Sequence, residues 1–444
     1  MLEKILELVG NRQFSAVRAM LADANIVDVA ELFESLDEAD AVVVFRLLPK
    51  EKAADVFSYM SKEIQKRIVE GITDVELSGI VQDLFIDDAV DFIEEMPANV
   101  VRRVLSNTNH ETRALINRFL QYKEDSAGSL MTIEFVGLKK EMTVADAFST
   151  IRKTGPDKET IYTCYVMDDR RKLEGIVTVK DLLLSDSAAL VGDIMDTKVI
   201  FVSTDDDKEE IAGLFQKYDF LSLPVVDKER RLVGIITIDD AVEVLQQENT
   251  EDFEIMAAVT PSEAPYLKTS VFSHAKHRVV WLMLLMLSAT FSGAILAKFE
   301  TAFQVLPSLV TFLPMLMDTG GNCGAQASTL VIRGLALGEI RGKDFLKVWW
   351  KEIRVAMLVG LVLALINIIR TWLIYDHNLL LAVAVSMSLF ITVMIAKSVG
   401  CLLPIAAKQL RLDPAIMASP LITTMVDACA LMVYFSIAKL VLHI

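Results

Sequence analysis

The chain has 444 residues, of which 53% are hydrophobic, a larger share than is usual in a soluble protein. Its net charge of −16 is unevenly divided. Residues 276–444 carry 14 basic and 8 acidic side chains, a net of +6, which leaves 30 basic and 52 acidic side chains, a net of −22, for residues 1–275. Phosphate would repel this acidic part, so no nucleic-acid partner is expected, and cation binding or simple solubility would each account for the charge.

Residues 1–125 have apolar side chains at three- and four-residue spacing, which predicts helices throughout. Two stretches of this region repeat with an offset of 48 residues, which places Asp40 on Asp88 and Pro49 on Pro97. A repeat of this length is typical of helical pairs that stack into a superhelix. We therefore predict an α-helical solenoid as the N-terminal domain.

Residues 126–240 change to β-branched segments that alternate with short helices. YVMDDRRKLEGIVTVKDLL and PVVDKERRLVGIITIDDAV repeat with an offset of 59, which places Val166 on Val225 and Gly175 on Gly234. Each half predicts a strand, a turn, a second strand and a helix. The pattern resembles a tandem pair of CBS modules, small α/β units that usually bind nucleotides or ions in the cleft between them.

After this pair, residues 241–273 predict an acidic connecting helix and a linker. Five runs without a charged side chain follow, and each approaches the ~20 residues of a membrane-spanning helix when its polar extensions are included. The runs are Val279–Ala297, Ala302–Met317, Val355–Ile369, Leu379–Ala396 and Ala415–Val426. Basic side chains gather before the first run, between the second and third, and between the fourth and fifth. Residues 274–444 therefore predict a transmembrane domain of five helices in the cell (inner) membrane, with the N-terminus cytoplasmic and the C-terminus outside.

The last run continues past an acidic side chain, Asp427. A charge at the centre of a membrane helix costs roughly 2.5–3.5 kcal/mol on insertion scales, so it requires a partner or a function. Thr423 and Thr424 lie one turn before it on the same helical face, and such oxygen ligands suit Mg²⁺ or Ca²⁺. We predict that the three residues contribute to a cation pore. The alternative is an internal ion pair of Asp427 with Lys397 or Arg370.

A second polar segment, Asp318 to Leu330, lies at the end of the second run. Its glycines permit close helix packing, and the amide of Asn322 offers an oxygen to an ion or its water. Asp413 precedes a proline at the start of the last run, where it predicts a helix cap that faces the acidic connecting helix. We expect no enzyme, because the chain has no Ser/His/Asp set, P-loop or dinucleotide fingerprint, and its four cysteines have no zinc-site spacing.

Taken together, the motifs resemble the MgtE family of Mg²⁺ transporters over the whole chain. The resemblance rests on YKEDSAGSLMT before the first CBS repeat, GGNCGAQASTLVIRGLALGEI in the second span and DPAIMASPLITTMVDACALMVYF in the fifth. It implies a homodimeric channel in the lipid bilayer with its pore on the dimer axis, where Asp427 of each subunit holds a hydrated Mg²⁺ and Asn322 lies near the constriction. Some homologues bind ATP between the CBS modules with an aromatic residue where this chain has Thr163, which weighs against a nucleotide here.

The resemblance also implies that Mg²⁺ bound among the cytosolic domains favours the closed state. Two acidic regions of a dimer repel each other without cations and can be bridged with them, and the opening would expose the linker around Lys123–Ser129. The predicted bridging residues are Asp87, Asp91, Asp207, Glu209, Asp219, Asp240, Glu243, Glu248, Glu251 and Asp252, with Asp413 at the membrane. A less selective transporter or exchanger of Co²⁺, Ni²⁺ or Mn²⁺, and a membrane-anchored sensor of Mg²⁺ or nucleotide, are the alternatives.

Overall fold

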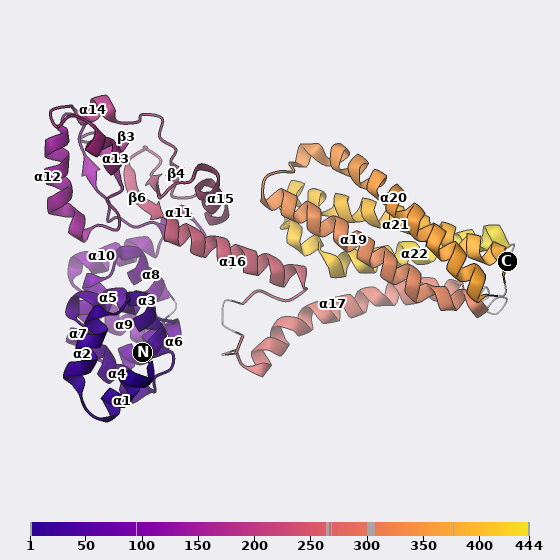
Figure 1. Ribbon diagram of the computed structural model, residues 1–444, viewed down its shortest axis with the longest axis horizontal. Helices are drawn as coiled ribbons and strands as arrows, with labels where there is room; N and C mark the ends of the chain where they lie inside the picture. Colours follow the sequence, from indigo (N-terminus) through magenta and orange to yellow (C-terminus); the bar gives the residue numbers. More distant parts are fainter. Residues whose placement is uncertain are drawn as a thin grey trace. The chain divides into compact units, whose positions relative to one another are not determined.

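The computed structural model describes residues 2–94, 96–262, 266–267, 269–299, 307–375 and 377–442 (Figure 1). The chain forms two compact units, Met1–Leu245 and Gln246–Ile444. The first unit contains the N-terminal helices and the α/β repeats. The second contains the long apolar helices.

Short helices make up the N-terminal region in the described residues. They are α1 (Leu2–Gly10), α2 (Phe14–Asp23), α3 (Ile26–Phe33), α4 (Glu38–Leu47), α5 (Lys50–Ser58), α6 (Lys62–Gly71), α7 (Asp74–Asp83), α8 (Ile86–Glu94), α9 (Ala98–Asn107) and α10 (His110–Phe119). From α2 to α5, each helix packs against the helix two places further along, as do α7 with α9 and α8 with α10. Pro49 and Pro97 are the N-cap residues of α5 and α9, so the predicted 48-residue repeat marks equivalent helix starts. The region is the α-helical solenoid that the sequence predicts.

Two small three-stranded sheets follow the solenoid. Their strands are β1 (Gly137–Leu138), β2 (Thr163–Met167), β3 (Leu173–Thr178), β4 (Val202–Ser203), β5 (Ser222–Val226) and β6 (Leu232–Thr237). In each sheet the first strand pairs parallel with the second, which pairs antiparallel with the third. Val166 faces Gly175 in one sheet and Val225 faces Gly234 in the other, so the 59-residue repeat has the same register twice.

Helices surround these sheets and continue the chain. They are α11 (Ala127–Leu130), α12 (Val144–Thr154), the 3₁₀ turn η1 (Gly155–Asp157), α13 (Val179–Leu184), α14 (Val191–Ile194), α15 (Lys208–Tyr218) and α16 (Ile238–Met256). The connecting helix therefore begins inside the second repeat, three residues before the predicted boundary at 241. The helix follows β6 directly, and at this junction the Thr237 hydroxyl donates to Asp240 Oδ2 over 2.7 Å.

The segment between the solenoid and the first sheet is anchored by backbone hydrogen bonds, and its predicted exposure on opening stays a prediction. The backbone N–H of Ala127 donates to the Asp206 carbonyl over 2.8 Å, and that of Gly128 donates to the Thr204 carbonyl over 3.0 Å. A Cβ on Gly128 would lie 2.5 Å from the Tyr122 ring, so only glycine fits here. The segment packs against the second repeat, whose buried side chains share one hydrophobic core with the solenoid.

The second unit consists of α17 (Val271–Lys298), the 3₁₀ turn η2 (Pro307–Phe312), α19 (Leu313–Ala336), the 3₁₀ turn η3 (Gly342–Asp344), α20 (Phe345–Ile374), α21 (Leu379–Gln409), the 3₁₀ turn η4 (Pro414–Met417) and α22 (Ser419–Leu442). Among the described residues, four helical stretches are long and apolar enough to cross a membrane, and they include α17, α20, α21 and α22. The helix α19 is also long enough to cross a membrane, but it is more polar than these four, because Asp318, Asn322 and Gln326 interrupt its apolar residues.

The prediction for the second span is wrong in its bounds. Residues 302–306 of the predicted run Ala302–Met317 lie outside the described part of the chain, residues 307–312 form the 3₁₀ turn η2, and α19 begins only at Leu313. The polar segment from Asp318 therefore occupies the centre of a helix instead of its end. Small residues explain the difference, because glycine, alanine and serine lower hydropathy without ending a helix that packs closely on its neighbours.

Candidate functional site

Asp427 lies in the third turn of α22, and among the described residues no basic side chain pairs with it. Its Oδ1 atom is buried and has no hydrogen-bond partner. Lys397 lies 3.7 Å from Glu352, measured from Nζ to Oε2, and Arg370 donates to the Met315 sulfur over 2.9 Å. Both basic side chains named as alternatives are therefore engaged elsewhere, which leaves the Asp427 carboxylate for another cation.

The two threonines before Asp427 have different surroundings. The Thr424 hydroxyl donates to the carbonyl of Pro420 over 2.8 Å, so its proton is engaged and its lone pairs can still accept. Thr423 faces α19, since a Cβ built on Gly321 would lie 2.8 Å from its methyl group and 3.4 Å from its hydroxyl. The predicted oxygen ligands thus lie along the side of α22 that meets α19.

The helix α19 has two unlike faces. Gly320, Gly321 and Gly324 are buried against α21 and α22, where a Cβ would meet side chains at 2.7–2.9 Å. The other face exposes polar side chains at helical spacing, namely Asp318, Asn322, Gln326 and Thr329. A polar stripe on a helix of an apolar bundle requires water, an ion or another chain to face it.

Asp413 forms the cap that the sequence predicts, but for a different element. Its carboxylate accepts a hydrogen bond from the backbone N–H of Ala415 over 2.8 Å. The residues that it caps form the 3₁₀ turn η4, and α22 begins separately at Ser419. The side chain is half-buried at the end of the membrane unit that also carries Lys408.

In the first unit, acidic side chains from three elements gather, and we call this set the acidic cluster. Its members are Asp87 and Asp88 of α8, Glu159 after η1, and Asp239 and Asp240 of α16. Burial, assisted by the neighbouring carboxylates, raises the pKa of Asp88 to about 6, of Asp240 to about 7 and of Glu159 to about 8. The Asp87 pKa is also well above its ordinary value, first through burial and then through Asp240.

Sequence reasoning found part of this cluster. It named Asp87 and Asp240, which the fold brings together, and Asp91, whose charge acts on Asp88. It missed Asp88, Glu159 and Asp239. Glu159 carries no local signal, because only the folding of the first CBS repeat onto the solenoid and α16 places it there. Asp88 could have been found from the sequence, because it aligns with Asp40 in the 48-residue repeat.

The other predicted residues of the soluble region are dispersed. Asp207 caps the start of α15 by accepting from the N–H of Glu209, whereas Asp219 follows its end in the left-handed region at φ 55°. Eleven residues of helix, about 16 Å, separate these two positions. Glu243, Glu248, Glu251 and Asp252 lie further along α16, and the last three belong to the second unit. Within one chain these acids lie at different helix ends and turns and do not form one group, so their bridging role in a dimer stays a prediction.

The acidic cluster is not a preformed metal cage. Within the described ranges, no three Asp, Glu, His or Cys side chains are placed to hold a metal ion together. The carboxylates are close enough to raise one another's pKa but do not converge on one point. This arrangement suits an ion that keeps its water shell, as Mg²⁺ does.

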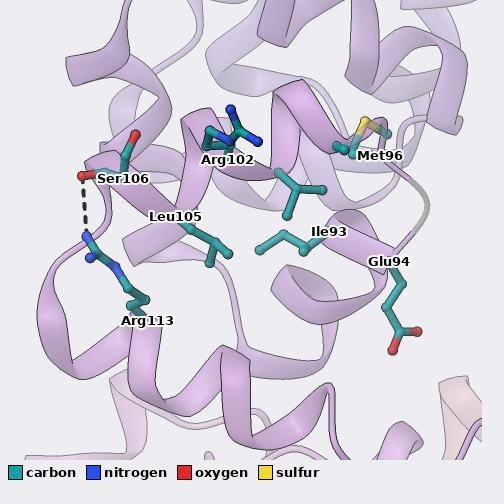
Figure 2. Close-up of a pocket in the computed structure, with 9 residues that line it drawn as sticks. Ile93, Glu94, Met96, Arg102, Leu105, Ser106 and Arg113 are labelled. Atoms are coloured by element: carbon teal, nitrogen blue, oxygen red, sulfur yellow. Dashed lines mark hydrogen bonds between the residues drawn. The ribbon is translucent and has the colours of Figure 1, made fainter.

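An open hollow of about 600 Å³ on the solenoid has different chemistry (Figure 2). Ile93 and Leu105 give it an apolar floor, and Arg102 and Arg113 add positive charge. Arg113 donates to the carbonyls of Ser106, as Figure 2 shows, and of Thr108, so it closes the end of α9. Glu94 is the one carboxylate in the lining of this hollow, and the two arginines outnumber it, so the charge of the lining does not favour a cation.

Apolar helices of membrane-spanning length, a polar helix packed among them and an unpaired carboxylate define the class of the protein as a membrane protein that handles cations. The family model for divalent cation transporters, MgtE, matches residues 313–437. The MgtE intracellular N domain matches residues 24–125, and CBS domains match residues 127–187 and 191–247.

Known proteins agree with these matches along nearly the whole chain. The magnesium transporter MgtE of Thermus thermophilus is 37% identical over 432 residues, which cover 96% of this chain and 95% of the relative. The magnesium transporter MgtE of Bacillus subtilis is 31% identical, with 96% of each chain covered. The crystal structure of the cytosolic domain of the Mg²⁺ channel MgtE in complex with ATP is 38% identical, covers 55% of this chain and all of its own, and has a TM-score of 0.52. The chain belongs to the MgtE family of divalent cation transporters.

This assignment confirms the resemblance that the sequence motifs indicate, together with the solenoid, the CBS pair and the apolar helical region. It also places the chain among transporters and not among enzymes. The individual site residues and the domain bounds remain predictions.

Proposed function

We propose that the protein is a Mg²⁺-selective channel or transporter of the cell membrane in which Asp427 binds the passing ion. The observation that carries this proposal is the buried, unpartnered Oδ1 atom of Asp427 on an apolar helix. A divalent ion about 5 Å from a carboxylate is attracted by roughly 7 kcal/mol at an effective dielectric constant near 20. That attraction exceeds the cost of roughly 2.5–3.5 kcal/mol for an acidic residue at membrane depth.

Hard oxygen ligands favour Mg²⁺ over softer metals, and a reluctantly dehydrated ion is held through its water. The hydroxyls of Thr423 and Thr424 and the amide of Asn322 are the further oxygen groups that we assign to this path. Asn322 is exposed on the polar face of α19, and Thr423 faces the neighbouring Gly321. We place the hydrated ion on the exposed side of α19, beside Asn322, with Thr423 at the contact between α19 and α22.

We infer that the functional form is a homodimer in the lipid bilayer. The polar stripe of α19 is exposed in one chain, and a second chain would turn it into the wall of a pore. In the soluble unit, Leu183 and Leu184 of α13 are 67% and 78% exposed, which also favours a second copy as the cover. The expected orientation keeps the N-terminus cytoplasmic and the C-terminus outside, because basic residues flank the connection from α19 to α20.

The acidic cluster supports a regulatory role for Mg²⁺ apart from its role as the transported ion. Carboxylates with raised pKa values repel one another when ionised, and a divalent cation relieves that repulsion. We assign the closed state to the cation-bound form. Within a dimer, the bridging residues that we retain are Asp87, Asp91, Asp207, Glu209, Asp219, Asp240, Glu243, Glu248, Glu251 and Asp252, with Asp413 at the membrane.

A nucleotide at the CBS pair has one supporting observation, since the similar cytosolic domain was crystallised with ATP. Against it, Thr163 occupies the first position of β2, where an aromatic side chain would be expected to stack on the base. Equilibrium dialysis of the purified protein with ATP decides between these readings. Binding that a Thr163→Tyr variant strengthens would support a nucleotide site with a weakened base contact.

Flux into proteoliposomes tests the proposed function. Purified protein is reconstituted, and uptake of Mg²⁺ is compared with uptake of Co²⁺, Ni²⁺ and Mn²⁺ at equal concentration. Preferential Mg²⁺ uptake supports the proposal. Equal uptake of all four ions would instead identify a less selective transporter, and no uptake of any ion would favour a membrane-anchored sensor.

A further inference from the structure

A buried ion pair joins α20 to α21 behind the polar helix α19. The Lys397 side chain is 5% exposed and the Glu352 side chain 12% exposed, and 3.7 Å separates Nζ from Oε2. Lys397 precedes Gln409, the last residue of α21, by 12 residues, which is about 18 Å of helix. A lysine this far from a helix end cannot reach water easily, so its charge is fixed in place.

Apolar groups enclose this pair on two sides. Ala356, one turn after Glu352, and Ala396, the neighbour of Lys397, belong to the same buried cluster as Cys323 of α19. Cys401, one turn after Lys397, packs in a second cluster beside Trp349. Charges surrounded by such groups are screened weakly, so their fields extend further than at a surface.

The pair lies level with the polar segment of α19. Cys323 is within the electrostatic reach of Lys397, and a Cβ on Gly324 would lie 3.3 Å from the Ala396 carbonyl. Asn322 is the residue before Cys323, about 100° further round the helix, and lies on the exposed side of α19. A positive charge therefore stands behind the helix whose front carries the amide, separated from it by about one helix diameter, roughly 10 Å.

We propose that Lys397 and Glu352 are specificity-determining residues of the ion path, in which Lys397 opposes the passage of cations along the polar face of α19 and Glu352 sets how much of that charge the ion feels. The inference rests on the proposed function, because it concerns the same path. Neither side chain contacts the ion, so both act at a distance. The interaction energy of a divalent ion with an unbalanced charge is twice that of a monovalent ion, so the pair affects the affinity for divalent ions most.

The test compares two single substitutions that unbalance the pair in opposite directions. Glu352→Gln leaves the lysine charge unbalanced and should raise the Mg²⁺ concentration for half-maximal flux by about tenfold. Lys397→Met leaves the carboxylate unbalanced and should lower that concentration by roughly threefold or more. The double variant, Glu352→Gln with Lys397→Met, should return to within about twofold of wild type, since neither charge remains.

A purely structural role predicts a different result. Both single variants would then lower the maximal flux and the melting temperature together, with the half-saturating concentration unchanged, and that result would overturn the proposal. If a single variant does not fold, the swapped pair Lys397→Glu with Glu352→Lys keeps an ion pair and places the carboxylate behind α19. It should lower the half-saturating concentration, and an unchanged value would contradict the charge effect.

Vesicles with the wild-type protein, measured in the same series, distinguish a failure of the ion-pair proposal from a failure of the proposed function. Wild-type Mg²⁺ flux with unshifted variants overturns the role of the pair and leaves the proposed function standing. Absence of wild-type flux overturns both.

Discussion

The acidic cluster of the first unit and Asp427 of the second differ in how many carboxylates lie together: the cluster has several, whereas Asp427 has an oxygen without a partner. The cluster draws five acids from α8, the first CBS repeat and α16, and burial with mutual repulsion raises the pKa values of Asp87, Asp88, Glu159 and Asp240. Asp427 is one acid on one helix, with a buried oxygen that has no partner. Several weak, shared ligands suit an ion that comes and goes with its concentration, whereas a single ligand suits an ion that passes.

The largest effect is expected at Asp427. Asp427→Ala should abolish measurable Mg²⁺ flux while the protein stays folded, because the substitution removes the only unpaired carboxylate that we assign to the path. Asp427→Asn keeps an oxygen of the same size and should retain partial flux with a weaker preference for divalent ions. The measurement is uptake into proteoliposomes, and the matched control is Asp344→Asn, an acid of the same unit that pairs with Lys347. Wild-type flux in Asp427→Ala would remove the pore assignment.

Neutralising the acidic cluster should have the next largest effect, and an opposite one. A variant with Asp87→Asn, Asp88→Asn, Glu159→Gln, Asp239→Asn and Asp240→Asn should take up Mg²⁺ even when the cation is abundant inside, because no carboxylates remain to bind the cation that bridges the closed state. Cells that express it should become sensitive to high external Mg²⁺. The control neutralises five exposed acids elsewhere in the same unit: Asp23, Glu38, Glu111, Glu141 and Asp205. Equal sensitivity of the two variants would assign the effect to net charge alone.

The pH dependence of stability sharpens the comparison further. The folded-state pKa values of Asp88, Asp240 and Glu159 lie above their ordinary values, so their contribution to stability is complete below about pH 4 and is lost as the pH rises through 6 to 8. Without divalent cations, the melting temperature of the full protein should fall over this range, by roughly 2–4 °C for each 1 kcal/mol lost. Millimolar Mg²⁺ should flatten the fall, because the cation favours the ionised carboxylates. Potassium chloride at equal ionic strength is the control, and an equal effect of that salt would indicate general screening.

The smallest effect concerns Thr178 and Thr237, the threonines at equivalent helix starts in the two CBS repeats. Thr178→Val and Thr237→Val should each cost about 1 kcal/mol, since the first removes a capping hydrogen bond and the second the hydroxyl hydrogen bond to Asp240. Only Thr237 holds a member of the acidic cluster, Asp240, so only Thr237→Val should also weaken Mg²⁺ protection against thermal unfolding. Equal loss of protection in both variants would contradict this prediction, because it would show that the Thr237–Asp240 hydrogen bond has no specific effect on Mg²⁺ binding.

The parts of the fold that repeat were predictable from the sequence. Val166 and Gly175 recur as Val225 and Gly234, and the same cross-strand pairs form in both sheets. Such patterns are local, because turn and strand signals lie within about twenty residues. Asp427 was predictable for the same reason, as a charge that interrupts an apolar run.

The parts that depend on contacts between distant segments were not predictable. The sequence offered Lys397 as a partner for Asp427, and only the packing of α20 on α21 shows that Glu352 is the nearer acid. Glu159 lies some 70 residues from α8 and joins the acidic cluster only in three dimensions. The centre of α19 was mistaken for a helix end because hydropathy falls at Asp318 while helix propensity and close packing continue.

The central claim is that the ion in the path and the ion at the acidic cluster are bound at separate places. Patch recordings test this claim, with Mg²⁺ on the C-terminal side as the current carrier. On the side of the soluble unit, Mg²⁺ is raised from micromolar to millimolar. The holding voltage is chosen so that Mg²⁺ continues to flow inward. The account predicts that the fraction of time spent open falls while the current through each open channel decreases only as its driving force does. Neutralising the acidic cluster should remove the first effect and not the second. An open fraction that ignores Mg²⁺ on the soluble side, or a wild-type response in the neutralised variant, would contradict it.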